Sequence, residues 1–235
     1  MAERVGLSRN ISEEYLNVVA DCKLADKPLL EARDILNALI GTHIHAETNI
    51  KNTRVILLNT WYRNELWFQN TCIEIAKEVT VPERLPLHWA LLMVAYPVFF
   101  DLCTIIGTML DYRDEFSATQ VKERIFETWS ARTTLIHALS KNLQTMKDMR
   151  ILEPQSKNGV YKPISHHVDN KKTVYVLAAA ILKCSGLEYM TWEEIVHHPA
   201  LFPFNIEYVT QADLATCDRF LLERMGDNIV IRFRT

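Results

Sequence analysis

The chain has 235 residues, of which 49% are hydrophobic and 23% charged, and its formal net charge at pH 7 is −3. This is an ordinary globular composition, and the length allows one large domain or two small ones whose core needs no disulfide or metal support. Six glycines are few for an all-β protein of this length, so the composition argues against that class and favours helices.

The cysteines and the N-terminus bear on the cellular compartment. No two cysteines share a C-x-x-C spacing, and the five are widely scattered: Cys22, Cys72, Cys103, Cys184 and Cys217. Free thiols in a reducing cytosol fit this pattern best. The N-terminal stretch "MAERVGLSRNISEEY" has no apolar core that could serve as a secretion signal. We therefore expect a cytoplasmic protein.

Residues 12–80 are expected to be helical. Ser12 is a candidate N-cap of a first helix, and Gly41 is a candidate C-cap of a second. The stretch "TNIKNTRVILLNTWYRNELWFQNTCIEIAKEV" carries apolar residues at helical spacing, although "RVILLNTW" also has strand character. The prolines of "VPERLP" then break the chain, which predicts a domain boundary. Residues 1–81 would form an N-terminal helical domain.

The most apolar segment runs from Leu85 to Leu110 and carries one formal charge, Asp101. Because roughly 20 apolar residues span a bilayer, a membrane helix is one interpretation. The charge-free part of the segment is shorter, however, and it contains two prolines and has no flanking basic cluster. We prefer a central core helix that kinks near Pro97, with Asp101 bound to a polar partner or at the surface.

A capping box is expected where Ser117 is followed three residues later by Gln120, so a helix should begin at Ala118 and run to about Thr128. Ser130 is positioned to cap the helix that follows.

This next helix is predicted from Ala131 to about Asp148, and at about 100° per residue it has two distinct faces. The apolar face contains Leu135, Leu139, Leu143, Met146 and Met149, with Ile136 at its margin. The polar face contains Thr133, Thr134, His137, Ser140, Lys141, Gln144 and Asp148. The first face should pack against the protein, and the second should meet solvent or a partner.

A hairpin is predicted directly after this helix. "RILEP" and "VYKPI" are short strand candidates joined through "QSKNG", in which Asn158-Gly159 is a strong hairpin signal. Helices at 87–110, 118–128 and 131–148 followed by a hairpin have the order of a winged helix. Residues 82–172 are therefore predicted to form a winged-helix-like domain with a short β-hairpin wing.

Residues 173–235 are predicted to form a C-terminal helical unit that ends in a short strand. "KKTVYVLAAAILKCSG" is expected to be a buried helix ended by Gly186, and capping boxes are expected at Thr191 and Thr210. "HHPALFPFNIEY" is expected to be a loop or short turn, and "DLATCDRFLLERMGDNIVIRFRT" a helix, a Gly226-Asp227 turn and an alternating strand. This end of the chain either makes a second small winged-helix-like unit or adds a strand to the first. The predicted fold class is thus mainly α.

The charge is unevenly distributed along the chain. Residues 118–172 contain ten Lys or Arg against five Asp or Glu, whereas the segments before and after have net charges of −5 and −3. A basic surface on an otherwise acidic protein is typical of phosphate binding, although a solvated face with no partner can have the same composition.

The helix from Ala131 and the hairpin supply the candidate DNA-binding residues. Short or donor-bearing side chains on the outward face of the helix could reach base edges or phosphates in a major groove, namely Thr133, Thr134, His137, Lys141 and Gln144. The residues that would lie over the flanking backbone are Arg132, near the helix start, and Lys157, Asn158 and Lys162 of the hairpin. The alternative is that the same helix face docks onto a protein partner.

Catalytic and metal-binding signals are not found in the sequence. The histidine pairs, His43 with His45, His166 with His167 and His197 with His198, have no third ligand at a recognisable spacing, so structural or exposed histidines are expected. There is no HExxH, Walker A, GxGxxG or GxSxG motif. We therefore predict a non-enzymatic protein with no catalytic residues, metal or cofactor.

Two stretches resemble the BrxA-like proteins of bacterial BREX phage-defence systems. "ARDILNALIGTHIHAETNIKNTRVILLNTW" resembles the N-terminal segment of that family, with Thr48 and Arg54 at the matching positions. "WSARTTLIHALSKNLQTMKDMRIL" resembles its W-S-x-x-T helix, with Trp129, Ser130 and Thr133 at the matching positions.

The BrxA-like resemblance implies a mainly helical protein with NusB-like and winged-helix-like features that binds DNA, and it adds Arg54 to the candidate DNA-binding residues. The chain departs from the family pattern at two positions. Thr134 stands where the family usually has Lys or Arg, and Met149 stands where the family ends the helix with Gly.

Two functions follow from these patterns. The first is a DNA-binding accessory protein of a BREX-like phage-defence system that acts on double-stranded DNA, with other defence proteins as further partners and no membrane association. The second is a protein-interaction scaffold that docks a larger defence enzyme through the aromatic residues between Tyr62 and Phe68 or through the "ALFPF" loop.

Overall fold

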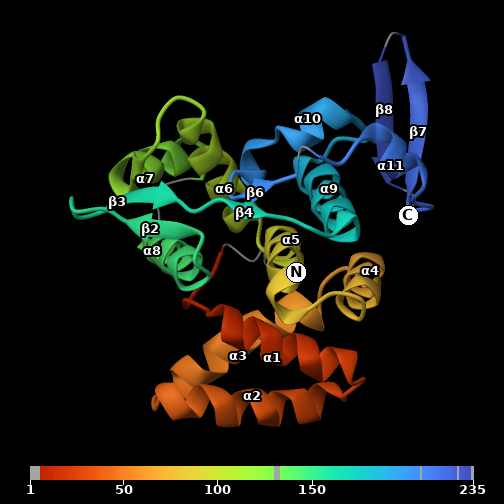
Figure 1. The fold of residues 1–235 in the computed structure, drawn as a ribbon. Coiled ribbons are helices and arrows are strands. Elements are labelled where there is room, and N and C mark those ends of the chain that lie inside the picture. Colours follow the sequence, from red (N-terminus) through yellow and green to blue (C-terminus); the bar gives the residue numbers. More distant parts are fainter. Residues whose placement is uncertain (1–5, 130–132, 207, 227, 234–235) are drawn as a thin grey trace.

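The computed structural model describes residues 6–129, 133–206, 208–226 and 228–233. In these ranges the fold is mainly helical, as the composition predicts, with eleven α-helices, two short 3-10 helices and three small sheets. Figure 1 shows the first three helices as a layer at the bottom, one helix bundle with a hairpin on the left, and a second on the right. The domain boundaries proposed above stay a prediction.

The N-terminal helices are confirmed, with different ends from those expected. They are α1 (Glu13–Leu24), α2 (Leu29–His43), α3 (Glu47–Trp61) and α4 (Leu66–Ala76). Ser12 caps α1 by accepting a hydrogen bond from the Tyr15 amide at 3.3 Å. Gly41 is not a C-cap, because α2 continues through His43. The "RVILLNTW" stretch is helical within α3, so its strand character is overridden.

The apolar segment forms two helices where one kinked helix was predicted. α5 (Leu85–Ala95) follows the short 3-10 helix η1 (Val81–Arg84), and α6 (Pro97–Leu110) begins directly after an extended Tyr96 with φ of −137°. Pro97 lacks an amide hydrogen and disfavours the helical conformation at Tyr96, so the helix breaks there. The two helices are bent by 116°, and no single described helix has the length and hydropathy to cross a membrane.

α5 lies at the centre of the molecule. All of its residues except Val94 are buried, as expected of a helix that is apolar all round. Trp89 is fully buried and contacts the rings of Phe99, Phe202 and Phe204 edge-on. The core therefore forms around α5, with cover from both ends of the chain.

The first helix–hairpin unit follows the predicted order. Its elements after α6 are β1 (Phe116–Ser117), α7 (Ala118–Thr128), α8 (Thr133–Asp148), β2 (Leu152–Pro154) and β3 (Val160–Pro163). Ser117 and Gln120 form the predicted capping box. β1 was not predicted; it pairs with β3 in an antiparallel sheet of order β1-β3-β2.

The C-terminal unit repeats this order. It consists of α9 (Lys171–Ser185), β5 (Met190–Thr191), α10 (Trp192–Val196), α11 (Gln211–Ala215), β7 (Phe220–Met225) and β8 (Asn228–Phe233). Gly186 ends α9 with a φ of 65°, and Thr191 and Thr210 form the predicted capping boxes. The helix predicted over "RFLLERM" is wrong, because these residues form β7 and pair with β8 along its length. Asp227 of the predicted turn lies outside the described residues.

Both units thus have one topology: helix, short strand, two helices and a hairpin, with the sheet order first strand, third strand, second strand. In both, a hydroxyl residue at the end of the first strand caps the next helix, namely Ser117 and Thr191. The two hairpins point to different sides of the molecule (Figure 1).

The units are joined by a two-stranded parallel sheet and by the 3-10 helix η2 (Pro199–Leu201). β4 (His166–His167) leads out of the first hairpin and pairs with β6 (Phe204–Asn205) of the second unit. The backbone of η2 lies against Gly107 of α6 so closely that a Cβ there would be 1.9 Å from the Pro199 carbonyl oxygen.

This packing excludes the "ALFPF" loop as a docking surface. Ala200, Leu201, Pro203 and Phe204 are buried, and the Ala200 carbonyl accepts a hydrogen bond from Trp89 Nε1 at 3.1 Å. The second proposed docking surface is also partly internal, because Phe68 is fully buried.

Candidate nucleic-acid interface

α8 carries the predicted apolar and polar faces. All five residues of the predicted apolar face are buried, and Ile136 at its margin is 40% exposed. Thr133, Thr134 and His137 are exposed on the opposite face, and Lys141 and Gln144 are half-buried. Ser130, Ala131 and Arg132, which were assigned to the cap and first turn, lie outside the described residues.

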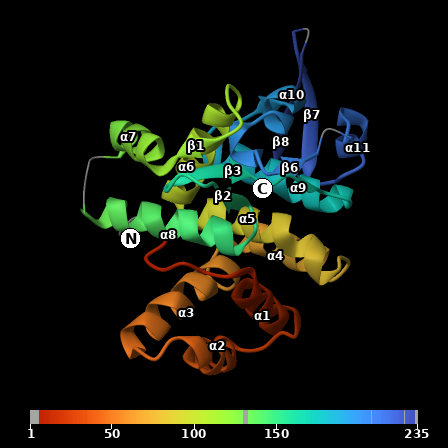
Figure 2. The ribbon, with the colours of Figure 1, turned by 60° about the vertical axis from the view of Figure 1, so that its left-hand side comes forward.

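The N-terminal segment fixes the second half of α8. The Ile11 amide donates to Thr145 Oγ1 at 3.0 Å, and Asn10 Nδ2 donates to Asp148 Oδ2 at 3.0 Å. Thr145 is fully buried, so this bond satisfies a polar group in the core. Figure 2 shows α8 crossing the front of the molecule between the N-terminal helices and α7.

Gln144 is already engaged at both ends of its amide. Its Nε2 donates to Asp148 Oδ1 at 2.7 Å, and its Oε1 accepts from Lys147 Nζ at 3.1 Å. A contact from Gln144 to a base would therefore compete with two bonds inside the protein. Thr133, Thr134, His137 and Lys141 form no side-chain hydrogen bond or ion pair among the described residues, so these four are available to a ligand.

The hairpin after α8 has the predicted strands and turn. Leu152–Pro154 pairs with Val160–Pro163, and Gly159 in the turn has a φ of 77°. Lys157, Asn158 and Lys162 are exposed and make no side-chain bond to another described residue. Glu153 is the cross-strand neighbour of Lys162, but the two charges form no ion pair.

Arg150 joins α8 to the hairpin and was not among the predicted site residues. α8 ends in a Schellman motif, in which the Arg150 amide donates to the Lys147 carbonyl at 2.9 Å and the Ile151 amide donates to the Met146 carbonyl at 2.8 Å. Arg150 occupies the left-handed position, with φ of 57°, where glycine is usual. Its exposed side chain lies free of ion pairs within the described chain. The only sequence signal for it was its place in the basic segment 118–172.

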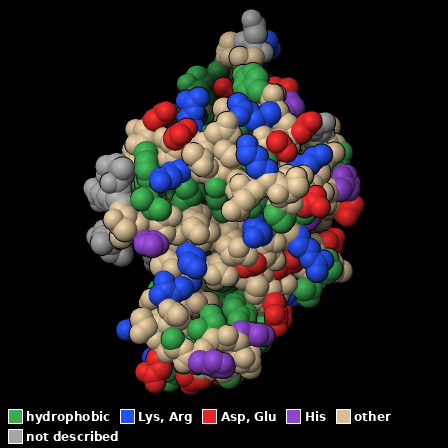
Figure 3. Space-filling model, turned by 90° about the vertical axis from the view of Figure 1, so that its left-hand side faces the viewer, with side chains coloured by type: hydrophobic (Ala, Val, Ile, Leu, Met, Phe, Trp, Pro, Cys, Tyr) green, Lys and Arg blue, Asp and Glu red, His purple; other side chains and the backbone are tan. Residues whose placement is uncertain are grey.

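Cations in the two units differ in their partners. In the first unit, none of Lys141, Lys147, Arg150, Lys157 and Lys162 forms an ion pair with a described residue. In the second, five cations are ion-paired: Lys171 with Asp213, Lys172 with Glu78, Lys183 with Glu65, Arg219 with Glu74, and Arg232 with Glu188 and Glu223. Figure 3 faces the β2–β3 end and shows Lys and Arg spread over its middle, with most acidic side chains nearer its edges. Arg124 of α7 pairs with Glu127, and Arg224 of β7 has no ion pair among the described residues, so the contrast holds for α8 and its hairpin, where five cations are without ion pairs.

The N-terminal candidates lie apart from this surface. Arg54 is on α3, and its guanidinium donates a hydrogen bond to Asn37 Oδ1 on α2. Burial and the neighbouring Arg33 lower the pKa of Arg54. Thr48 is exposed in the first turn of α3. Among the described residues, no hydrogen bond or ion pair joins the Arg54 side chain to α8 or to the hairpin.

Three of the paired histidines have structural partners among the described residues. His197 pairs with Glu193 at 2.9 Å, His166 bonds the Arg150 carbonyl at 2.9 Å, and His198 accepts from the Ala200 amide at 3.2 Å. Within the described ranges, no group of three or more His, Cys, Asp or Glu side chains is arranged to hold a metal ion.

Comparison of the chain with protein-family models, with curated proteins and with solved structures gave no match. The geometry of the site itself therefore carries the functional argument.

Proposed function

We propose that α6 to β3 form a winged-helix domain that binds double-stranded DNA, with α8 as the recognition helix and the β2–β3 hairpin as the wing. The element order and the sheet order β1-β3-β2 support this assignment. The apolar face of α8 packs inward and its polar face is exposed, which is the orientation that a major-groove helix requires.

The observation that carries the proposal is the set of five unpaired cations on α8 and the hairpin of an otherwise acidic chain. Contacts to phosphates supply most non-specific affinity for DNA, and cations that form no ion pair within the protein need not break one to make these contacts. Lys141 and Arg150 would contact phosphates beside the groove, and Lys157 and Lys162 would contact the flanking backbone. Thr133, Thr134 and His137 would face base edges.

The resemblance to BrxA-like proteins extends the proposal to the biological setting. We propose a non-enzymatic accessory role in a BREX-like phage-defence system, in which this chain supplies DNA contact and other defence proteins supply the chemistry. Arg54 is proposed as a DNA contact because of this resemblance alone. Arg132 is proposed as one because of the sequence pattern alone.

The test is a salt titration of DNA binding. Each phosphate contact adds about 0.9 to the slope of log affinity against log salt concentration, so changing Lys141, Lys157 and Lys162 to alanine should flatten the slope by up to about 2.7. Affinity for unrelated duplexes should fall about equally. Fluorescence anisotropy at several salt concentrations measures both quantities.

Three lysines of α9 provide a matched control. Changing Lys171, Lys172 and Lys183 to alanine alters the net charge by the same amount, but these side chains are ion-paired to Asp213, Glu78 and Glu65. The control should change the slope by less than about one unit. If both triple variants lost the same amount of salt slope, net charge alone would explain the DNA binding. If the wild type did not bind DNA at low salt, the protein-scaffold role would be favoured.

A further inference from the structure

The second unit has the topology of the first but the opposite charge character. Between Lys183 and Arg219 the sequence contains no Lys or Arg and six Asp or Glu. An acidic segment of this kind repels phosphate groups. The shared topology alone therefore does not make the second unit a second DNA-binding unit.

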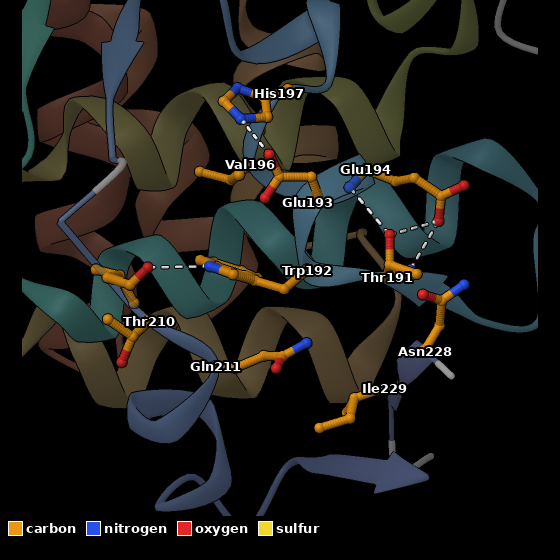
Figure 4. Close-up of a pocket in the computed structure, with 11 residues that line it drawn as sticks. Thr191, Trp192, Glu193, Glu194, Val196, His197, Thr210, Gln211, Asn228 and Ile229 are labelled. Atoms are coloured by element: carbon orange, nitrogen blue, oxygen red, sulfur yellow. Dashed lines mark hydrogen bonds and ion pairs between the residues drawn. The ribbon is translucent and has the colours of Figure 1, made fainter. Parts of the chain in front are cut away.

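A groove with a volume of about 950 Å³ lies in this acidic segment. It is bounded by α10, by the start of α11 and by the tip of the β7–β8 hairpin. Figure 4 shows Thr191 and Trp192 on one side, with Gln211 and Ile229 across from them.

The floor and the rim of the groove differ in polarity. Trp192 is nearly buried and donates from Nε1 to the Val209 carbonyl at 3.0 Å, which fixes the indole in the wall. Val196 is half-buried and Ile229 at the hairpin tip is 41% exposed, whereas Val209 is buried behind them. An occupant therefore needs an apolar part that can cover Ile229 and Val196.

Two carboxylates line the α10 side. Glu193 is highly exposed, and among the described residues its one ion-pair partner is His197, at 2.9 Å. Glu194 accepts bonds from the backbone and side chain of Thr191, which lower its pKa and keep it ionised at neutral pH. No Lys or Arg is among the residues described as lining the groove. An occupant therefore also needs positive charge.

From this combination we infer that the groove binds a basic peptide segment of a partner protein, with apolar residues against Ile229 and Val196 and Lys or Arg side chains against Glu193 and Glu194. A duplex nucleic acid would place phosphates beside these carboxylates, which is unfavourable. The inference does not depend on DNA binding by the first unit, because the two surfaces lie on different units of the fold.

The probe is a short fluorescent peptide, Lys-Lys-Leu-Ile-Leu-Lys-Lys, whose apolar centre and basic ends match the groove. Binding to the full chain is measured by anisotropy at low salt. Changing Glu193 and Glu194 together to glutamine should weaken binding about tenfold, because two surface charge pairs are removed. Glutamine at position 194 can still accept the Thr191 bonds, so the capping box and the fold are retained.

Glu13 and Glu14 provide the matched control, since they also lie in the first turn of a helix. The pair of glutamine substitutions there should leave peptide affinity within about twofold, although it removes the same net charge. Ile229→Thr keeps a β-branched residue in β8 and should weaken binding about fivefold through lost apolar contact. A peptide with serine in place of the three apolar residues should lose affinity to a similar degree.

Several results would overturn the inference. Equal loss of affinity in the two glutamate variants would show that only net charge attracts the peptide. A concentration-dependent mass of the wild type in sedimentation that the Glu193 and Glu194 variant abolishes would assign the groove to a second copy of the chain. Weaker DNA binding by that variant would assign it to nucleic acid. Melting curves of all variants verify that each is folded.

Discussion

The indole nitrogen of Trp129 donates a hydrogen bond to Asp101 Oδ2 at 2.5 Å, which joins the end of α7 to the middle of α6. Asp101 is the one formal charge of the apolar segment, and it is half-buried. The expectation that Asp101 has a polar partner is thus confirmed.

Trp129→Phe should destabilise the protein by about 1–3 kcal/mol, because it removes the donor and leaves a half-buried carboxylate without a partner. Urea unfolding at neutral pH measures the change. The control is a double-mutant cycle with Asp101→Ala, in which the cost of Trp129→Phe should fall by about 1 kcal/mol or more. An unchanged cost in that background would mean that ring packing, not the hydrogen bond, is responsible.

Gly107→Ala should destabilise the fold by about 3 kcal/mol, the upper end of overpacking costs, since the new methyl group would meet the rigid backbone of Pro199 at 1.9 Å. Gly41 is the control, because nothing lies within 4 Å of a Cβ built there and the residue is inside α2. Gly41→Ala should stabilise by about 0.5–1 kcal/mol. Thermal melting compares the two, and the same sign for both variants would contradict the close approach of α6 and η2.

Buried His88 should make the protein sensitive to mild acid. Its Nδ1 accepts a bond from Trp61 Nε1 at 3.1 Å, so Nε2 carries the hydrogen and donates to Asn17 Oδ1 at 3.0 Å. Burial and the nearby Arg84 lower the pKa of His88 from 6.5 to about 3. The unfolded chain therefore binds a proton as the pH falls below 6.5 while the folded chain does not, and stability is lost through this window down to about 3.

Within this pH window, the free energy of unfolding should fall by up to about 1.4 kcal/mol for each pH unit. His88→Gln should have lower stability at neutral pH but a shallower decline between about pH 6.5 and 5, a range above the ordinary pKa of the carboxylates. A smaller decline of stability with falling pH should remain in His88→Gln, because burial also lowers the pKa of His198. Parallel pH profiles of the wild type and His88→Gln would refute this account.

Arg150→Gly should move stability and DNA affinity in opposite directions. Glycine relieves the left-handed conformation, which should stabilise by about 0.5–1 kcal/mol, and loss of the cation should reduce the salt slope of DNA binding by about 0.9. Asp26→Gly is the control, because Asp26 is also left-handed, with φ of 51°, at the end of α1. It should stabilise slightly and leave the salt slope unchanged. A loss of stability in Arg150→Gly would mean that the side chain has an unrecognised packing role.

Short-range sequence signals were sufficient to predict the secondary structure at the centre of the candidate interface. The capping box at Ser117 and Gln120, the periodicity of α8 and the Asn158-Gly159 turn each depend on residues close together in the chain, and each predicted its element correctly. The left-handed turn at Arg150 could not be predicted, because no glycine marks it.

Elements that depend on distant partners were missed or misassigned. β1 has two residues and exists only through pairing with β3, so it has no pattern of its own. β7 has a helix-compatible sequence, and pairing with β8 overrides that preference. The "ALFPF" loop has the composition of a docking surface, and only the position of Trp89 shows that it belongs to the core. The repeated topology of the two units is likewise not evident from the sequence, because the second hairpin depends on the pairing of β7 with β8.

The central position of α5 has a consequence for the synthesis of the protein. Trp89 is covered in part by the segment around Ala200, which lies 111 residues later in the chain. At roughly 5–20 residues per second, a ribosome needs about 6–22 s to add that segment. During this interval a helix that is apolar on every side has no complete cover, and it is the natural target for a chaperone bound to the nascent chain.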